Sequence, residues 1–269
     1  MRTIIAPVDF SDASFNALSF AAELARRAQA LLIPVNVLAD GEDEEESIAK
    51  LRAVEADLRK TFGEDLKCEA RVVHGSLVST LQALVDDVRP DLLVMGTKGA
   101  TGLKRILIGS NTVKVLAKTL VPVLIIPEVA KFESFQKKGK NRIVLATDLD
   151  SLENEEILDV LKEIAMMLTD PAINVLSVRP KNTMLPDYQR LERDFLLSFF
   201  KPEIETERIT VFSNNVISGI NFYLEKKSED TGLVAMIARD SGEMIQKHYT
   251  REMASHTHLP LLVIHDFKP

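Results

Sequence analysis

An internal repeat is the feature that most constrains the fold of this 269-residue chain. The segment RTIIAPVDFSD at the start resembles NRIVLATDLDS in the middle, which aligns Asp9 with Asp148. The segment LVPVLIIPE resembles HLPLLVIHD near the end, which aligns Pro122 with Pro260. Because the two offsets differ by a single residue, the repeat predicts two copies of one domain.

The repeat also predicts where the copies begin and end. We expect domains at residues 1–128 and 141–269, joined by a linker at 129–140. The linker sequence is polar and basic, VAKFESFQKKGK, which is typical of a connecting segment.

Each copy alternates Val/Ile/Leu runs with amphipathic stretches, which indicates parallel strands covered on both faces by helices. Apolar residues at helical spacing predict a helix after each of the first four strands, the first with Ser11 as N-cap and the fourth reaching Leu120. The expected strands of the first copy are Thr3–Val8, Ala30–Leu38, Lys67–His74, Asp91–Gly96 and Val121–Pro127. Those of the second copy are Arg142–Thr147, Ile173–Val178, Glu207–Phe212, Leu233–Ala238 and Leu261–His265.

This order predicts an α/β fold with two tandem, doubly wound, five-stranded parallel sheets. The switch point of each sheet then lies between its first and fourth strands. Ligands of such sheets bind outside the carboxyl ends of the strands at that point.

A glycine-rich stretch, MGTKGATGLKRILIGSN, follows the fourth strand of the first copy on this ligand side. Its glycines are spaced as Gly96-x2-Gly99-x9-Gly109, and Ser110 opens the next helical pattern. Glycine lets backbone N–H groups approach an anion closely, and a helix start adds further donors. The stretch therefore favours a phosphate cradle over a plain loop. It is neither a Walker A loop nor the G-x-G-x-x-G of a dinucleotide fold.

This glycine spacing, with APVDFS at 6–11 and PVLIIP at 122–127, resembles the universal stress protein (UspA-like) family. The resemblance covers the whole chain as two tandem copies. It implies the strand order 3-2-1-4-5 of the adenine-nucleotide alpha-hydrolase-like fold. It also implies ATP, AMP or ADP as ligand, with a magnesium ion as an optional companion.

The resemblance assigns roles in the first copy. Asp9 lies beside the adenosine, Pro7 and Val8 offer backbone edges to the adenine, and Val37 packs on the base. Met95 lines the pocket, and the phosphates and ribose meet the glycines and the residues after them. The implied site is Pro7, Val8, Asp9, Val37, Met95, Gly96, Gly99, Gly109, Ser110, Asn111 and Thr112.

Plainer interpretations stay open for two of these residues. Asp9 near the Ser11 N-cap is equally suited to fixing the first helix, and both roles are compatible. Val37 can also be an ordinary core residue, as a valine in a buried strand usually is.

The second copy departs from the motif. By sequence alignment Ala238 or Arg239 stands where the first glycine should be, Gly242 alone remains nearby, and Lys247–His248 replaces the last glycine and serine. We expect a degenerate domain that has lost the nucleotide cradle.

The composition and the charge argue against several classes of protein. The net charge of −7 argues against a general nucleic-acid or anionic-membrane binder. The lone Cys68 cannot form an internal disulfide, and no stretch is long and apolar enough for a membrane span or a signal peptide, so we expect a cytoplasmic protein. The histidine spacing near the end matches no standard zinc site, so no metal site is expected.

These observations leave three functions open. The first is a stress-response regulatory protein that binds nucleotide with at most slow hydrolysis, acting on an unknown protein partner. The second is a slow ATPase or nucleotidyl-transferring enzyme, although no catalytic residue is identifiable, and the third is a nucleotide-free interaction scaffold. The resemblance further implies an intramolecular pseudo-dimer of the two domains through their fifth strands, with homodimerisation of the chain also open.

Overall fold

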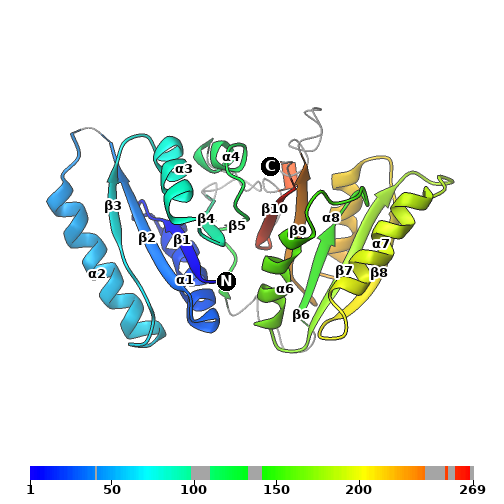
Figure 1. The fold of residues 1–269 in the computed structure, drawn as a ribbon, viewed down its shortest axis with the longest axis horizontal. Helices are drawn as coiled ribbons and strands as arrows, with labels where there is room; N and C mark the ends of the chain where they lie inside the picture. The colour runs from blue at the N-terminus through cyan, green and yellow to red at the C-terminus, as the bar shows by residue number, and fades with distance from the viewer. Residues whose placement is uncertain (40, 98–109, 133–140, 240–251, 254–257, 267–269) are drawn as a thin grey trace. The chain divides into compact units, whose positions relative to one another are not determined.

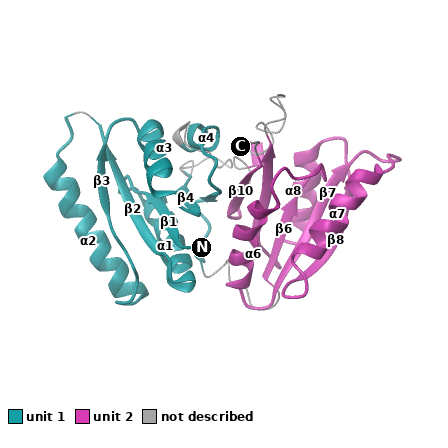
Figure 2. Ribbon diagram, viewed as in Figure 1, with its two compact units in different colours: residues 1–132 teal, residues 133–269 magenta. Residues whose placement is uncertain are grey.

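The computed structural model describes residues 1–39, 41–97, 110–132, 141–239, 252–253 and 258–266. The chain divides into two compact units, Met1–Phe132 and Glu133–Pro269 (Figure 2). The predicted linker lies largely outside the described residues. Each unit is a twisted sheet with helices packed on it (Figure 1).

The N-terminal unit is a parallel sheet in the order β3-β2-β1-β4-β5. This confirms the predicted doubly wound fold and its 3-2-1-4-5 order. Its elements are β1 (Thr3–Pro7), α1 (Asp12–Ala28), β2 (Leu31–Leu38), α2 (Glu44–Phe62), β3 (Arg71–His74), α3 (Leu77–Val88), β4 (Leu92–Gly96), α4 (Ser110–Leu116) and β5 (Val123–Ile126).

The C-terminal unit is a second parallel sheet, in the order β10-β9-β6-β7-β8. Counted from its own first strand this is again 3-2-1-4-5, so the tandem fold expected from the repeat is confirmed. Its elements are β6 (Asn141–Ala146), the 3₁₀ helix η1 (Glu155–Leu158), α6 (Asp159–Met166), β7 (Pro171–Arg179), α7 (Asp187–Phe199), β8 (Glu205–Phe212), α8 (Val216–Lys226), β9 (Thr231–Arg239) and β10 (Leu261–Asp266).

The central strands form the core of each unit. Ile4 and Ile5 in β1 and Leu92 and Leu93 in β4 have no exposed surface. Strands buried on both faces need apolar residues at every position, which explains their continuous Val/Ile/Leu runs. The described helices include none that is both long and apolar enough to cross a bilayer.

Two predicted boundaries were wrong. The third strand begins at Arg71, not at Lys67, because Cys68 makes only an isolated bridge to Leu32. The fourth helix ends at Leu116, and Leu120 is 67% exposed. Pro122 follows closely, and a proline shortly after a helix end cannot continue it.

Candidate functional site

The turn between β1 and α1 lies at the carboxyl edge of the N-terminal sheet, where the sequence predicts a ligand. Ser11 is the N-cap of α1, as predicted, and its side chain accepts a hydrogen bond from the Ser14 amide. The Oδ1 atom of Asp9 accepts hydrogen bonds from the Ser11 amide at 3.0 Å and from the Ser11 hydroxyl at 2.5 Å. Between them, Phe10 has a φ of 60°, in the left-handed region. The position of Asp9 is thus set by local bonds within a tight turn.

The residues predicted to meet the base differ in accessibility. Asp9 is exposed, and Pro7 and Val37 are partly exposed, whereas Val8 and Met95 are buried. The Val8 amide donates to the Val35 carbonyl at 2.8 Å, and Pro7 has no amide proton. The backbone of Pro7 and Val8 therefore offers no free amide donor to a base at this edge.

Gly96 ends β4 in a position that only glycine can occupy. A Cβ atom built on it would lie 2.4 Å from the carbonyl oxygen of Ala13 and 2.8 Å from its carbonyl carbon. The first turn of α1 therefore packs directly against the end of β4. Close approach to α1 alone explains this glycine, whether or not a ligand also requires it.

Two threonines lie next to Gly96. The Thr112 hydroxyl on α4 donates to the Gly96 carbonyl over 3.4 Å, and Thr112 is buried. Thr97 is fully buried and its amide donates to Ile126, while its hydroxyl has no hydrogen-bond partner. Sequence reasoning missed Thr97, although its position directly after the first glycine of the motif was a usable signal.

The rest of the predicted cradle cannot be placed. Gly99 and Gly109 lie outside the described residues. Ser110 and Asn111 open α4, but their side chains also lie outside the described part of the structure. The structure thus brings Pro7, Val8 and Asp9 to the edge of the sheet that holds Gly96 and Thr112, with Val37 on the neighbouring strand β2.

A cavity of about 230 Å³ lies elsewhere in this unit, lined by Gln29, Asp65 and Lys67 among others. It adjoins the start of β2, at the opposite edge of the sheet from the strand carboxyl ends. The cations that line it are engaged: Arg26 pairs with Glu23, and Lys67 donates to the Gln29 carbonyl at 3.0 Å. This cavity is therefore a weaker candidate for an anionic ligand than the carboxyl edge of the sheet.

Among the described residues, no cluster of acidic, histidine or cysteine side chains could hold a metal ion.

Strand register shows what replaces the first glycine in the C-terminal unit. Leu93 lies opposite Val123 in one unit, and Val234 lies opposite Leu261 in the other. Because the repeat aligns Pro122 with Pro260, Gly96 corresponds to Ile237. The predicted alternatives, Ala238 and Arg239, were wrong by one and two positions, because alignment of a divergent loop does not fix strand register.

The bulk of Ile237 is tolerated because the helix that follows β6 starts later in the sequence than its counterpart α1, which follows β1. In the repeat, Asp12 at the start of α1 corresponds to Ser151. The first helical turn of the C-terminal unit begins only at Glu155. The close helix-to-strand contact that requires Gly96 therefore has no counterpart at Ile237.

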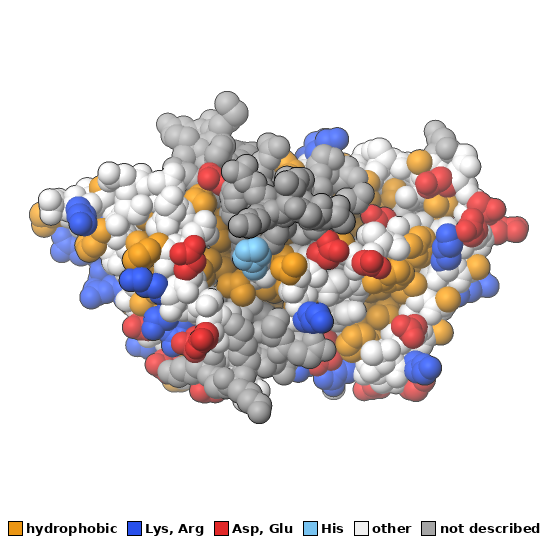
Figure 3. Space-filling view, turned by 180° about the vertical axis from the view of Figure 1, so that it is seen from behind, with side chains coloured by type: hydrophobic (Ala, Val, Ile, Leu, Met, Phe, Trp, Pro, Cys, Tyr) orange, Lys and Arg blue, Asp and Glu red, His pale blue; other side chains and the backbone are white. Residues whose placement is uncertain are grey.

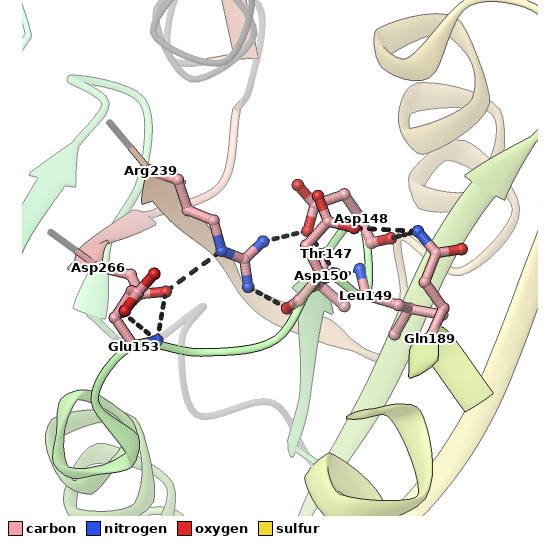
Figure 4. A network of polar contacts seen from close by, with 8 residues as sticks. All are labelled: Thr147, Asp148, Leu149, Asp150, Glu153, Gln189, Arg239 and Asp266. Carbon is pink, nitrogen blue, oxygen red and sulfur yellow. Dashed lines mark hydrogen bonds and ion pairs between the residues drawn. The ribbon is translucent and has the colours of Figure 1, made fainter. Parts of the chain in front are cut away.

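The carboxyl edge of the C-terminal unit is occupied by an arginine (Figure 4). The Arg239 guanidinium donates to the Asp148 carboxylate, to Asp266 at 3.2 Å and to the Asp150 carbonyl at 2.5 Å. Asp266 also accepts from the Glu153 amide, at 3.0 Å. Asp148 is the repeat counterpart of Asp9, so the residue predicted at the ligand in one unit is bound to an internal cation in the other.

Glu192 on α7 belongs to the same charged region. It is buried, and its Oε1 atom has no hydrogen-bond partner. Burial raises the pKa of this carboxyl, Arg239 opposes the rise, and Glu155 and Asp266 add to it.

On the face of the molecule shown in Figure 3, acidic and basic side chains are interspersed among the described residues.

Comparison with known proteins identifies the N-terminal unit. Residues 1–127 match the sequence model of the universal stress protein family. The N-terminal half of the chain is therefore a domain of the universal stress protein family. A universal stress protein of Methanocaldococcus jannaschii is 29% identical over 149 residues, which cover 48% of this chain and 84% of that protein. One from Synechocystis is 31% identical over 94 residues, or 34% of this chain and 32% of that protein.

The whole chain, with both of its units, also has a structural counterpart. The crystal structure of a universal stress protein from Archaeoglobus fulgidus matches with a TM-score of 0.76. The match covers 98% of both chains at 18% identity, so it shows a shared fold and no more.

Proposed function

We propose that this protein binds ATP or another adenine nucleotide in its N-terminal domain and acts as a regulatory binding protein in a stress response. Two features support this: residues 1–127 belong to a universal stress protein domain, and that domain carries the glycine motif described above. The proposed site is Pro7, Val8, Asp9, Val37, Met95, Gly96, Gly99, Gly109, Ser110, Asn111 and Thr112.

The observation that carries the proposal is the pairing of β1 with β4. These strands are neighbours in the sheet, with Ile4 opposite Leu92 and Ile5 opposite Leu93. The chain leaves β1 toward β2 on one side and enters β4 on the other, so their carboxyl ends form the switch point at which such sheets bind ligands. Gly96 is the last residue of β4, and Asp9 lies two residues after the end of β1.

We propose further that the C-terminal domain, at 141–269, binds no nucleotide. Its first glycine is replaced by Ile237, and Arg239 fills the carboxyl edge with an internal ion pair. A cytoplasmic location and a pseudo-dimer of the two domains stay predictions of the sequence and of the family resemblance.

Calorimetric titration with ATP tests the proposal. We expect about one ATP per chain for the wild type. Gly109→Asp should weaken binding at least about tenfold, because a carboxylate there repels phosphate and blocks approach to the backbone amides. Gly242→Asp makes the same change in the other copy and should bind as the wild type does. Wild-type protein without ATP binding, or equal binding by Gly109→Asp, would contradict the proposal.

The same samples test for turnover. Asp9, the carboxylate that follows β1, is hydrogen-bonded to Ser11 and placed by the family resemblance at the adenosine, away from the phosphate that would be transferred. We therefore expect no sustained release of phosphate. Sustained release that is lost in Asp9→Ala would establish an enzyme instead.

A further inference from the structure

A buried hydrogen-bond relay connects α2 to the end of β1. The Ser47 hydroxyl on α2 donates to the side-chain oxygen of Asn36 on β2, at 2.5 Å. The Asn36 side-chain amide then donates to the carbonyl of Val8, at 2.7 Å. All three residues are buried, and Asn36 is only 7% exposed.

The relay is unusual because Asn36 interrupts a strand of apolar residues, between Val35 and Val37. A buried amide is costly unless its hydrogen bonds are made, and a valine would satisfy strand packing without that cost. What the asparagine adds here is a donor to the Val8 carbonyl, at a position beyond the last residue of β1.

This donor helps fix the peptide group that leads into Asp9. The Val8 amide is held by Val35, the Val8 carbonyl is held by Asn36, and Asp9 is held by Ser11. The intervening Phe10 adopts a left-handed conformation, which is costly for a non-glycine residue and persists only when its surroundings hold it. The direction of the Asp9 side chain therefore depends on bonds on both sides of the turn.

We infer that Asn36 is a positioning residue for the ligand edge: it does not touch the ligand, but fixes the Val8–Asp9 peptide that presents the carboxylate to an adenine nucleotide. This inference rests on the proposed function for the nature of the ligand. The buried geometry that supports it is independent of that function.

The test compares two buried asparagines. Asn36→Asp is nearly isosteric and still accepts from Ser47, but its ionised carboxylate cannot donate to the Val8 carbonyl, so the variants are compared at about pH 9, where ionisation is favoured. Asn174→Asp is the matched control: Asn174 on β7 is 1% exposed and donates its side-chain amide to the Tyr223 hydroxyl in the other unit. We expect both variants to lose stability. Only Asn36→Asp should raise the Kd for ATP, by about tenfold at a temperature where all proteins are folded.

A double-mutant cycle with Asp9→Ala separates positioning from general destabilisation. If Asn36 acts through Asp9, Asn36→Asp should change the Kd much less when Asp9 is already removed. Equal effects in both backgrounds, or the same Kd for Asn36→Asp and Asn174→Asp, would overturn the inference.

Amide hydrogen exchange gives a readout that does not require ATP. The amides from Asp9 to Ser14 should exchange about tenfold faster in Asn36→Asp and at the wild-type rate in Asn174→Asp. Unchanged exchange in Asn36→Asp overturns the inference even if ATP binds. Failure of the wild type to bind ATP overturns the proposed function and the nucleotide part of the inference, while faster exchange would still establish Asn36 as the residue that fixes this turn.

Discussion

Arg239 donates a hydrogen bond to Asp148, the residue that the internal repeat aligns with Asp9. In the N-terminal unit the aspartate is exposed at the edge of the sheet, bonded to Ser11. In the C-terminal unit its counterpart is bound to a guanidinium from β9, which also pairs with the buried Asp266. The same fold thus leaves the aspartate at the carboxyl edge exposed in the N-terminal unit and pairs it with an internal arginine in the C-terminal unit.

Removing the cation from the C-terminal edge should destabilise that unit. In Arg239→Met, Asp266 would stay buried without its ion-pair partner, which we expect to cost about 3 kcal/mol of unfolding free energy. Arg190→Met, which breaks an exposed pair with Asp187, should cost less than about 1 kcal/mol. Denaturant unfolding of both variants measures the difference. If Arg239→Met and Arg190→Met were equally stable, the Arg239 ion pairs would contribute little to the unfolding free energy.

Adding a single methyl group at the end of β4 should disturb the N-terminal unit. In Gly96→Ala the new Cβ would overlap the Ala13 carbonyl, which is backbone and cannot rotate away. We expect a loss of about 1–3 kcal/mol, as for other overpacked sites. Thermal unfolding of Gly96→Ala at the wild-type midpoint would contradict the close contact.

The strands and their order could be predicted from the sequence because buried parallel strands leave continuous apolar runs. Boundaries such as the start of β3 could not, because Cys68 looks like any other strand residue until its pairing is known. The sequence predicts only one of the two roles of Gly96. Its place in a glycine motif indicates a ligand, whereas its contact with Ala13 depends on how α1 packs, which no local pattern records.

The relay and the ion pairs were harder still to predict. The donor in Asn36 and its acceptor at Val8 are far apart in sequence and meet only because β1 and β2 pair in register. Arg239 likewise reaches Asp148 and Asp266 from a third strand. Long-range polar contacts of this kind follow from topology and leave no periodic signal in the sequence.

Glu192 should make the stability of the C-terminal unit depend on pH. Burial raises the pKa of this carboxyl in the folded state above its ordinary value of 4.5, so folding favours the protonated form. The unfolding free energy should therefore fall as the pH rises from that value through the folded pKa, and then level off. Glu192→Gln removes this loss and should be more stable than the wild type at about pH 8, with the advantage disappearing near pH 4. An advantage that is constant with pH would contradict this account.

The thiol of Cys68 should be unreactive in the folded protein. Burial raises its pKa to about 12, and the side chain is almost completely shielded from solvent. Because the thiolate is the nucleophile, alkylation by iodoacetamide near pH 8 should be negligible without denaturant and complete in concentrated guanidinium. Mass spectrometry counts the adducts, and rapid labelling of folded protein would show that the segment around Cys68, which bridges to Leu32 ahead of β3, opens readily.

The location of the nucleotide is the central claim of this account, and photo-crosslinking tests it most directly. The folded wild-type protein is irradiated with 2-azido-ATP and digested, and the labelled peptides are identified by mass, with excess ATP as competitor. We predict that labelling is competed by ATP and confined to peptides from residues 1–128, with loss of label in Gly109→Asp. Competed label in peptides from residues 141–269, or label that ATP does not displace, would contradict it.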